Sequence, residues 1–94
     1  MTTPLEKNIE KAVKEYARSK GWLAYKWTSP GHAFVPDGIL ISPTGKVVMV
    51  EFKREGAKPT PMQEREHARL RKQGCNVWII DSVAVGKVCI DAAT

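Results

Sequence analysis

The sequence has little of what membrane, secreted or zinc-binding proteins need. Its 94 residues include two cysteines and two histidines, too few for a disulfide framework and without the Cys/His spacing of a zinc site. No apolar run approaches the roughly 20 residues that cross a bilayer. The start, MTTPLEKN, lacks the charged-then-apolar profile of a secretion signal. We therefore expect one domain over residues 1–94, with two inert thiols, in a reducing cytoplasm and without a membrane partner.

Phosphate-cradling glycine loops, internal repeats and interdomain linkers are also missing from the sequence. What is present is an excess of positive charge. There are 15 Lys and Arg against 10 Asp and Glu, a net charge of +5. This balance suits a polyanion such as nucleic acid, although many small basic proteins bind none. The hydrophobic fraction of 43% and the charged fraction of 27% are those of an ordinary globular protein.

Two segments begin with the same helix-start formula. In Thr3-Pro4-Leu5-Glu6, threonine is a suitable N-cap, proline a suitable first helical residue, and glutamate the partner of a capping box. Apolar residues then recur at helical spacing until Gly21. Thr60-Pro61-Met62-Gln63 repeats the formula with glutamine as the partner, and predicts a helix to about Gln73.

Strands are expected between and after these helices. Ser42–Gly45 is a turn between two apolar segments, and predicts a hairpin. The tail is ambiguous, and we favour a weak strand at Lys87–Ile90. The predicted architecture is an α/β fold of order α-β-β-β-α-β with a central mixed sheet. The other expected strands are Trp22–Trp27, Val35–Ile41, Val47–Lys53 and Asn76–Asp81.

Charged side chains follow the apolar part of the central strand, at its end. Val47–Val50 is continuously apolar, yet Glu51 and Lys53 follow without a turn and share one face of the strand. The hairpin places Asp37, at the entry of the preceding strand, at the same end of the sheet. Two close carboxylates repel, and a divalent ion with hard oxygen ligands, Mg²⁺ or Mn²⁺, resolves the conflict. Lys53 would orient water and stabilise charge on a phosphate. The alternative is an ordinary Glu-Lys pair at the solvated end of a strand.

Pro36-Asp37 followed by Glu51-Phe52-Lys53, on this order of elements, resembles the PD-(D/E)XK nuclease superfamily. More narrowly, the chain is similar to the virus-type replication-repair nuclease (VRR-NUC) domain in its stand-alone phage form, over about residues 5–83. The tail after Ser82 departs from the short helix expected of that family. The resemblance implies a restriction-endonuclease-like core flanked by helices, and the cytoplasm of a host cell as the location. It is also carried by Glu6 with Ile9, Ser29–Gly31, KPTPMQ and GCNVWIIDS.

The resemblance also implies the roles of individual residues. Asp37 and Glu51 would bind the metal together with the backbone carbonyl of Phe52, and Lys53 would be the catalytic lysine. Glu6 would point toward the metal from the first helix, and Gln63 would reach in from the second. Capping explains Glu6 and Gln63 about as well as catalysis does, since each is the third residue of a capping box.

For Gln63 the helix face favours the catalytic role. Gln63, His67 and Leu70 share one stripe, and Leu70 must face the sheet. His32 could shuttle a proton, although a histidine in a loop is more often merely exposed.

Basic residues follow the candidate site. Phosphate contact is the better explanation for Arg54 and Lys58. Lys26, on the strand before the loop at Ser29–Gly31, and Ser29 itself are further candidates. A solvated helix face explains the basic residues farther along, Arg65, Arg69 and Lys72.

These features predict a metal-dependent DNA endonuclease that hydrolyses phosphodiester bonds, with Mg²⁺ or Mn²⁺ and no small-molecule cofactor. We expect a homodimer that acts on branched DNA, a four-way-junction resolvase, because symmetric nicks need two sites related by a two-fold axis. Trp22, Trp27 or the tail would form the dimer contact. The alternatives are a non-catalytic nucleic-acid-binding module with a nuclease-like fold, and a flap or restriction-type endonuclease.

Overall fold

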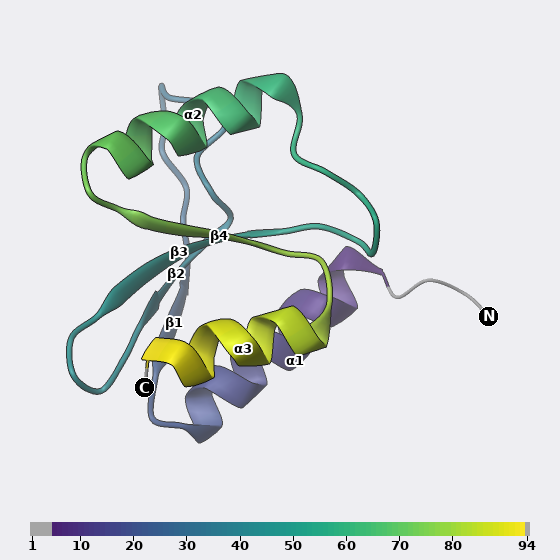
Figure 1. The fold of residues 1–94 in the computed structure, drawn as a ribbon, viewed down its shortest axis with the longest axis vertical. Helices are drawn as coiled ribbons and strands as arrows, with labels where there is room; N and C mark the ends of the chain where they lie inside the picture. Colours follow the sequence, from purple (N-terminus) through teal and green to yellow (C-terminus); the bar gives the residue numbers. More distant parts are fainter. Residues whose placement is uncertain (1–4, 94) are drawn as a thin grey trace.

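A computed structural model describes residues 5–93 as three helices and a four-stranded sheet. The strands lie in the order β1-β2-β3-β4. Helices α1 and α3 cover one face of the sheet and α2 covers the other (Figure 1). The predicted α/β class with a helix-flanked mixed sheet is thus confirmed. The elements are α1 (Glu6–Ser19), β1 (Leu23–Lys26), β2 (Gly38–Ile41), β3 (Val47–Phe52), α2 (Pro61–Lys72), β4 (Asn76–Ile80) and α3 (Val83–Ala93).

The predicted hairpin joins β2 and β3. The strands are antiparallel, with Gly38 opposite Val50 and Ile41 opposite Val47. In the turn, the Ser42 hydroxyl accepts a hydrogen bond from the Lys46 backbone N–H at 2.9 Å, and Gly45 supplies a φ of 86° that a side chain would disfavour. The register brings the entry of β2 beside the end of β3. Strand β4 then pairs with β3 in parallel.

The core fills the space between the sheet and the α1/α3 layer. Helix α1 presents buried residues at helical spacing, as its periodicity predicted. Trp22 is also buried, with 2% of its surface exposed. The expectation that Trp22 supplies an exposed dimer contact is therefore wrong. No helix within residues 5–93 is long and apolar enough to cross a bilayer. The core comprises Ile9, Val13, Ala17, Trp22, Leu40, Val48, Val50, Phe52, Ile80, Cys89 and Ile90.

The tail is a helix, so the predicted strand at Lys87–Ile90 is wrong. Helix α3 begins after Ser82, whose hydroxyl accepts a hydrogen bond from the Val85 N–H at 3.1 Å. Its valines and glycine are poor helix formers, which is why local propensity favoured a strand. Packing against α1 decides the conformation instead. A Cβ on Gly86 would lie 2.3 Å from a methyl of Val13, so only glycine permits this close approach.

The helix starts differ from each other. Helix α2 has the predicted capping box, in which Thr60 Oγ1 accepts from the Gln63 N–H at 3.2 Å and Gln63 Oε1 accepts from the Thr60 N–H at 2.9 Å. Helix α1 begins at Glu6, with Leu5 as an N-cap that makes no side-chain hydrogen bond. Glu6 is therefore the first helical residue and not the third. The predicted cap at Thr3 and Pro4 lies outside the described residues.

Candidate active site

Three carboxylates from separate elements meet at one end of the sheet. Glu6 comes from the first turn of α1, Asp37 from the entry of β2, and Glu51 from the end of β3. Each offers an oxygen that lies within 4.8 Å of the other two. Glu6 is exposed, Asp37 is half-buried and Glu51 is buried. The cluster is therefore shielded from solvent at Glu51 and open to solvent at Glu6.

Asp37 is held in place by the backbone of β3. Its Oδ2 accepts a hydrogen bond from the Phe52 N–H at 2.8 Å. Its own carbonyl accepts from the Trp27 N–H at 2.8 Å, which ties it to the segment after β1. The aspartate therefore has one carboxylate oxygen fixed beside Glu51, because Phe52 is the next residue along β3.

Glu51 carries the largest electrostatic perturbation at this site. Burial first, and then the neighbouring Asp37 carboxylate, raise its pKa to about 8, and Lys53 opposes them only in part. Only 2% of Glu51 is exposed. Without a cation, this carboxyl group therefore keeps a proton at neutral pH.

Lys53 is positioned by the second helix. Its Nζ donates a hydrogen bond to Gln63 Oε1 at 2.8 Å. The same oxygen accepts from the Thr60 N–H, as part of the capping box. Both explanations of Gln63 therefore have a geometric basis, since it caps α2 and holds the ammonium of Lys53.

His67 is a component of this site that the sequence analysis did not assign. It lies on α2 one turn after Gln63 and is 1% exposed, and its Nε2 is 3.4 Å from Glu51 Oε1. Neither atom has a hydrogen-bond partner among residues 5–93. Burial, followed by the charges of Arg71 and Lys53, lowers the pKa of His67, so a neutral imidazole adjoins the Glu51 carboxyl. Its shared stripe with Gln63 was the available signal.

Two known proteins are similar to this chain in sequence or in structure. No protein-family model matches the sequence. The chain is 48% identical over 77 residues to "Putative nuclease p44" of Acyrthosiphon pisum secondary endosymbiont phage 1, a match over 82% of this chain and 83% of that protein. A solved structure described as "VRR_NUC domain" is similar with a TM-score of 0.85 and 37% identity, over 92% of this chain and 94% of the other.

The chain belongs to the VRR-NUC family of nucleases. The predicted family membership and the restriction-endonuclease-like fold are both confirmed. Nuclease activity, the hydrolysis of phosphodiester bonds in nucleic acid, follows from that membership. The elements that bring Glu6, Asp37 and Glu51 together, α1, β2 and β3, are thus part of a nuclease fold.

The donor set of this VRR-NUC chain fits a divalent metal ion. The three carboxylates supply the hard oxygen ligands that Mg²⁺ and Mn²⁺ prefer. Glu51 Oε1 is a buried oxygen without a hydrogen-bond partner in the described residues, which is costly unless a cation or proton offsets it. The Phe52 side chain is fully buried in the core, so Phe52 can reach this site only through its backbone.

The expected DNA contacts of the VRR-NUC chain lie at the end of β1 and in the loops that follow β1 and Lys53. Lys26 ends β1 and is paired with Gly38, the residue after Asp37. Ser29 lies in the following loop, where its carbonyl accepts from the His32 N–H at 3.1 Å. Arg54 and Lys58 are exposed in the loop that follows Lys53. These contacts remain predictions.

Proposed function

We propose that this nuclease is a metal-dependent endonuclease of branched DNA, with Mg²⁺ or Mn²⁺ held by Asp37, Glu51, Glu6 and the Phe52 carbonyl. The observation that carries this proposal is the three-carboxylate cluster with its buried, unpaired Glu51 oxygen. A divalent ion bound there would polarise the phosphate and activate water. It would also offset the negative charge that raises the pKa of Glu51.

Side chains of the protein would supply the other functions of the site, which are charge stabilisation, orientation of the ligands and contact with DNA. Lys53, held by Gln63, presents its ammonium on the same strand face as Glu51 and stabilises charge that builds on the phosphate. Asp37 keeps its orientation through the Phe52 N–H. His67 lies beside the buried Glu51 oxygen, with its Nε2 at 3.4 Å. Arg54, Lys58, Lys26 and Ser29 would contact the flanking DNA backbone.

The experiment that tests this function compares four-way-junction, flap and fully paired duplex DNA as substrates. The purified protein is incubated with each substrate in Mg²⁺, Mn²⁺ or a chelator. We expect paired nicks in the junction with either metal and no cleavage with the chelator. Cleavage that persists in the chelator would contradict the metal proposal. Binding without cleavage under every condition would favour the non-catalytic module.

The first prediction concerns the stability of the protein in a chelator. Burial and Asp37 raise the pKa of Glu51 to about 8 in the folded chain, from an unfolded value near 4.5. The stability linked to this proton is fully present below the unfolded pKa and is lost as pH rises through about 8. We expect the Tm difference between Glu51→Gln and the wild type to grow in favour of the variant from pH 5 to pH 9, by about 5 °C or more.

Calorimetry across that pH range measures this difference. Added Mg²⁺ should stabilise the wild type at pH 9 and have much less effect on Glu51→Gln, because an ion replaces the proton. A pH-independent difference between the two proteins would show that Glu51 ionises normally in the fold.

A homodimer is proposed on geometric grounds. The chain has a radius of gyration of 12.8 Å, and residues 5–93 contain one such carboxylate cluster. A junction needs two opposed nicks, which a two-fold dimer supplies.

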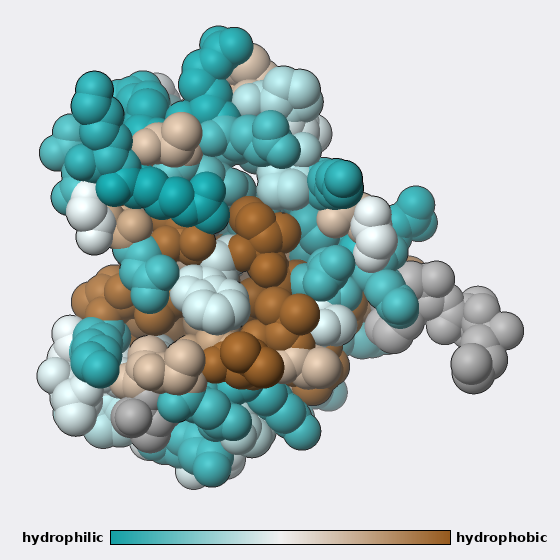
Figure 2. All heavy atoms as spheres, viewed as in Figure 1, coloured by the Kyte–Doolittle hydropathy of each residue, from teal (hydrophilic) through white to brown (hydrophobic). Residues whose placement is uncertain are grey.

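Apolar side chains gather on the face formed by the edge strand β4 and by α3 (Figure 2). Trp78 and Ile79 of β4 are only half-buried, and Val88 of α3 is 59% exposed. We propose a second copy of the chain as the partner of this face.

The second prediction tests that face. Val88→Glu should convert the dimer to a monomer, because it places a charge in an apolar contact. Light scattering at micromolar concentration measures the mass. Val47→Glu is the matched control, because Val47 is 47% exposed at the far end of β3 and should leave the dimer intact. A wild-type monomer, or a Val88→Glu dimer, would contradict this interface.

A further inference from the structure

A hollow of about 250 Å³ lies between the loop at residues 31–34 and the first turns of α2. Its walls combine apolar side chains with cations. Phe34 and Met62 are 44% and 45% exposed as whole residues, and Arg65 and Arg69 also line the hollow. Aromatic faces beside cations are the elements with which proteins bind single-stranded nucleic acid.

The acidic residue in this hollow is already paired. Glu66 is 9% exposed, and its Oε1 lies 2.9 Å from His32 Nε2 and 3.7 Å from Arg69. His32 lowers the pKa of Glu66 the most, and Arg69 contributes. The His32–Glu66 contact joins the loop to α2, and the Arg69 guanidinium offsets the charge of the carboxylate in this hollow.

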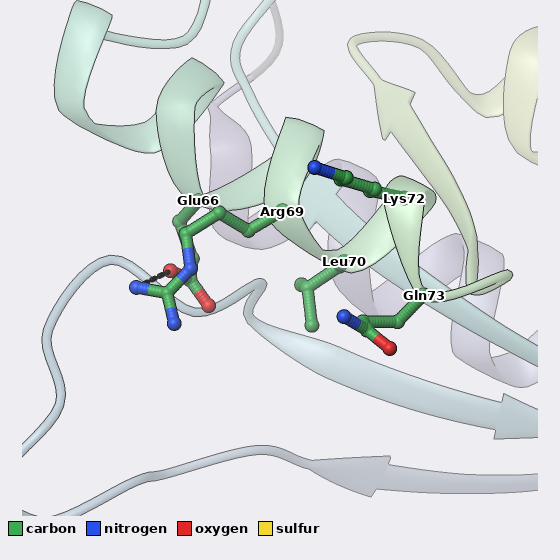
Figure 3. A pocket seen from close by; sticks show the side chains of 5 residues that line it. All are labelled: Glu66, Arg69, Leu70, Lys72 and Gln73. Carbon is green, nitrogen blue, oxygen red and sulfur yellow. Dashed lines mark ion pairs between the residues drawn. The ribbon is translucent and has the colours of Figure 1, made fainter.

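The hollow continues along α2 into a second one of about 330 Å³. Glu66 and Arg69 line both, so the two hollows are neighbours. The ion pair of Arg69 with Glu66 and the side chain of Lys72 are visible there (Figure 3). A strand that leaves the first hollow in this direction would pass one further cation, Lys72. The remaining residues of the second hollow are Leu70 and Gln73.

Phe34 has a backbone conformation that folding does not explain. Its φ is 69°, and within residues 5–93 no other non-glycine residue has a positive φ. Such a conformation is strained for a bulky side chain. Phe34 as a whole nevertheless remains 44% exposed and is not part of the core cluster. A strained, exposed aromatic residue is more readily explained by binding than by stability.

This hollow adjoins the candidate active site. Phe34 precedes Asp37 by three residues, so their Cα atoms are within about 11 Å of each other. Met62 directly precedes Gln63, which accepts the Lys53 hydrogen bond at 2.8 Å. Successive nucleotides of a duplex strand are about 3.4 Å apart along its axis. DNA cleaved at the carboxylates would therefore reach the hollow within a few nucleotides.

We propose that this hollow binds an unpaired nucleotide of the cleaved DNA strand, with its base stacked on Phe34 and its phosphates near Arg65 and Arg69. The inference rests on the proposed function and deepens it, because a base that stacks on a side chain must leave its complementary partner. Branched DNA that carries an unpaired nucleotide at its branch point presents such a base, and plain duplex does not. The nuclease thereby gains from stacking a preference for such branched DNA over duplex.

The test measures DNA affinity in the Glu51→Gln background, without cleavage. The probes are a branched DNA with one unpaired nucleotide beside the branch and a fully paired duplex of the same length. Phe34→Ala should weaken binding of the branched probe by roughly five- to a hundredfold and leave duplex binding unchanged. Phe34→Trp should retain the preference. Leu23→Ala, at a side chain 53% exposed on β1, should bind as the parent does.

Phe34→Gly supplies a second readout. It relieves the positive φ, so it should raise the Tm while weakening binding of the branched probe as much as Phe34→Ala does. Equal loss on both probes, or no loss with Phe34→Ala, would overturn the inference. A switch from dimer to monomer in Phe34→Ala would also overturn it and assign the hollow to a protein contact. Failure of the wild type to cut any DNA with metal would count against the proposed function, whereas these affinities judge the hollow independently.

Discussion

Glu51→Gln should slow DNA cleavage by roughly a thousandfold or more, while the protein stays folded. The substitution keeps the shape of the side chain and removes the charge that would hold a divalent ion. Charge stabilisation by a catalytic metal amounts to several kcal/mol, and each 1.36 kcal/mol changes the rate tenfold. The buried Glu51 is the least replaceable of the three carboxylates, because Glu6 is exposed and water can substitute for it.

Cleavage of a four-way junction under single-turnover conditions in Mg²⁺ measures this effect, and circular dichroism confirms the fold. Glu15→Gln is the matched control, because it makes the same chemical change at an exposed position of α1. Wild-type rates from a folded Glu51→Gln protein would refute the site assignment.

Lys53→Met should reduce the cleavage rate by roughly a hundredfold to a thousandfold and leave metal binding intact. Loss of one positioned electrostatic group has this magnitude. Methionine keeps much of the aliphatic stem, so half-buried packing is retained while the ammonium is lost. Gln63 would lose the partner that it holds at 2.8 Å but keep its capping bond to Thr60. Helix α2 should therefore remain in place.

The measurement pairs single-turnover cleavage with calorimetric Mn²⁺ binding to the DNA-free protein. Lys46→Met, in the exposed β2–β3 turn, is the control for loss of one positive charge. If Mn²⁺ binding disappeared together with Lys53, the role of the lysine would be to hold the carboxylates together. Unchanged cleavage would remove Lys53 from the mechanism.

Two parts of the molecule could be predicted from local sequence patterns. The hairpin follows from Ser42–Gly45, and a strand's two-residue period then places Asp37 and Glu51 at one end of the sheet. The start of α2 follows from its capping box, because the hydrogen bonds join residues three apart. In each case the groups that interact are close in the sequence, so residue type and spacing determine the geometry.

Other parts depended on contacts between distant segments. Helix α3 forms against its local propensity because Gly86 lets it pack on Val13. Glu6 approaches the other carboxylates because α1 packs on the sheet. His67 adjoins Glu51 because α2 covers the opposite face.

By itself, the sequence thus determined the elements with strong local signals and the carboxylate pair on the hairpin. The tertiary structure alone decided that the Glu6 carboxylate, expected only from the family resemblance, meets the other two. It alone also decided the buried imidazole and the terminal helix. The physical reason is the distance in sequence between the residues that interact. Turns and caps are stabilised by hydrogen bonds between near neighbours, whereas these features are set by burial and packing among segments far apart in the chain.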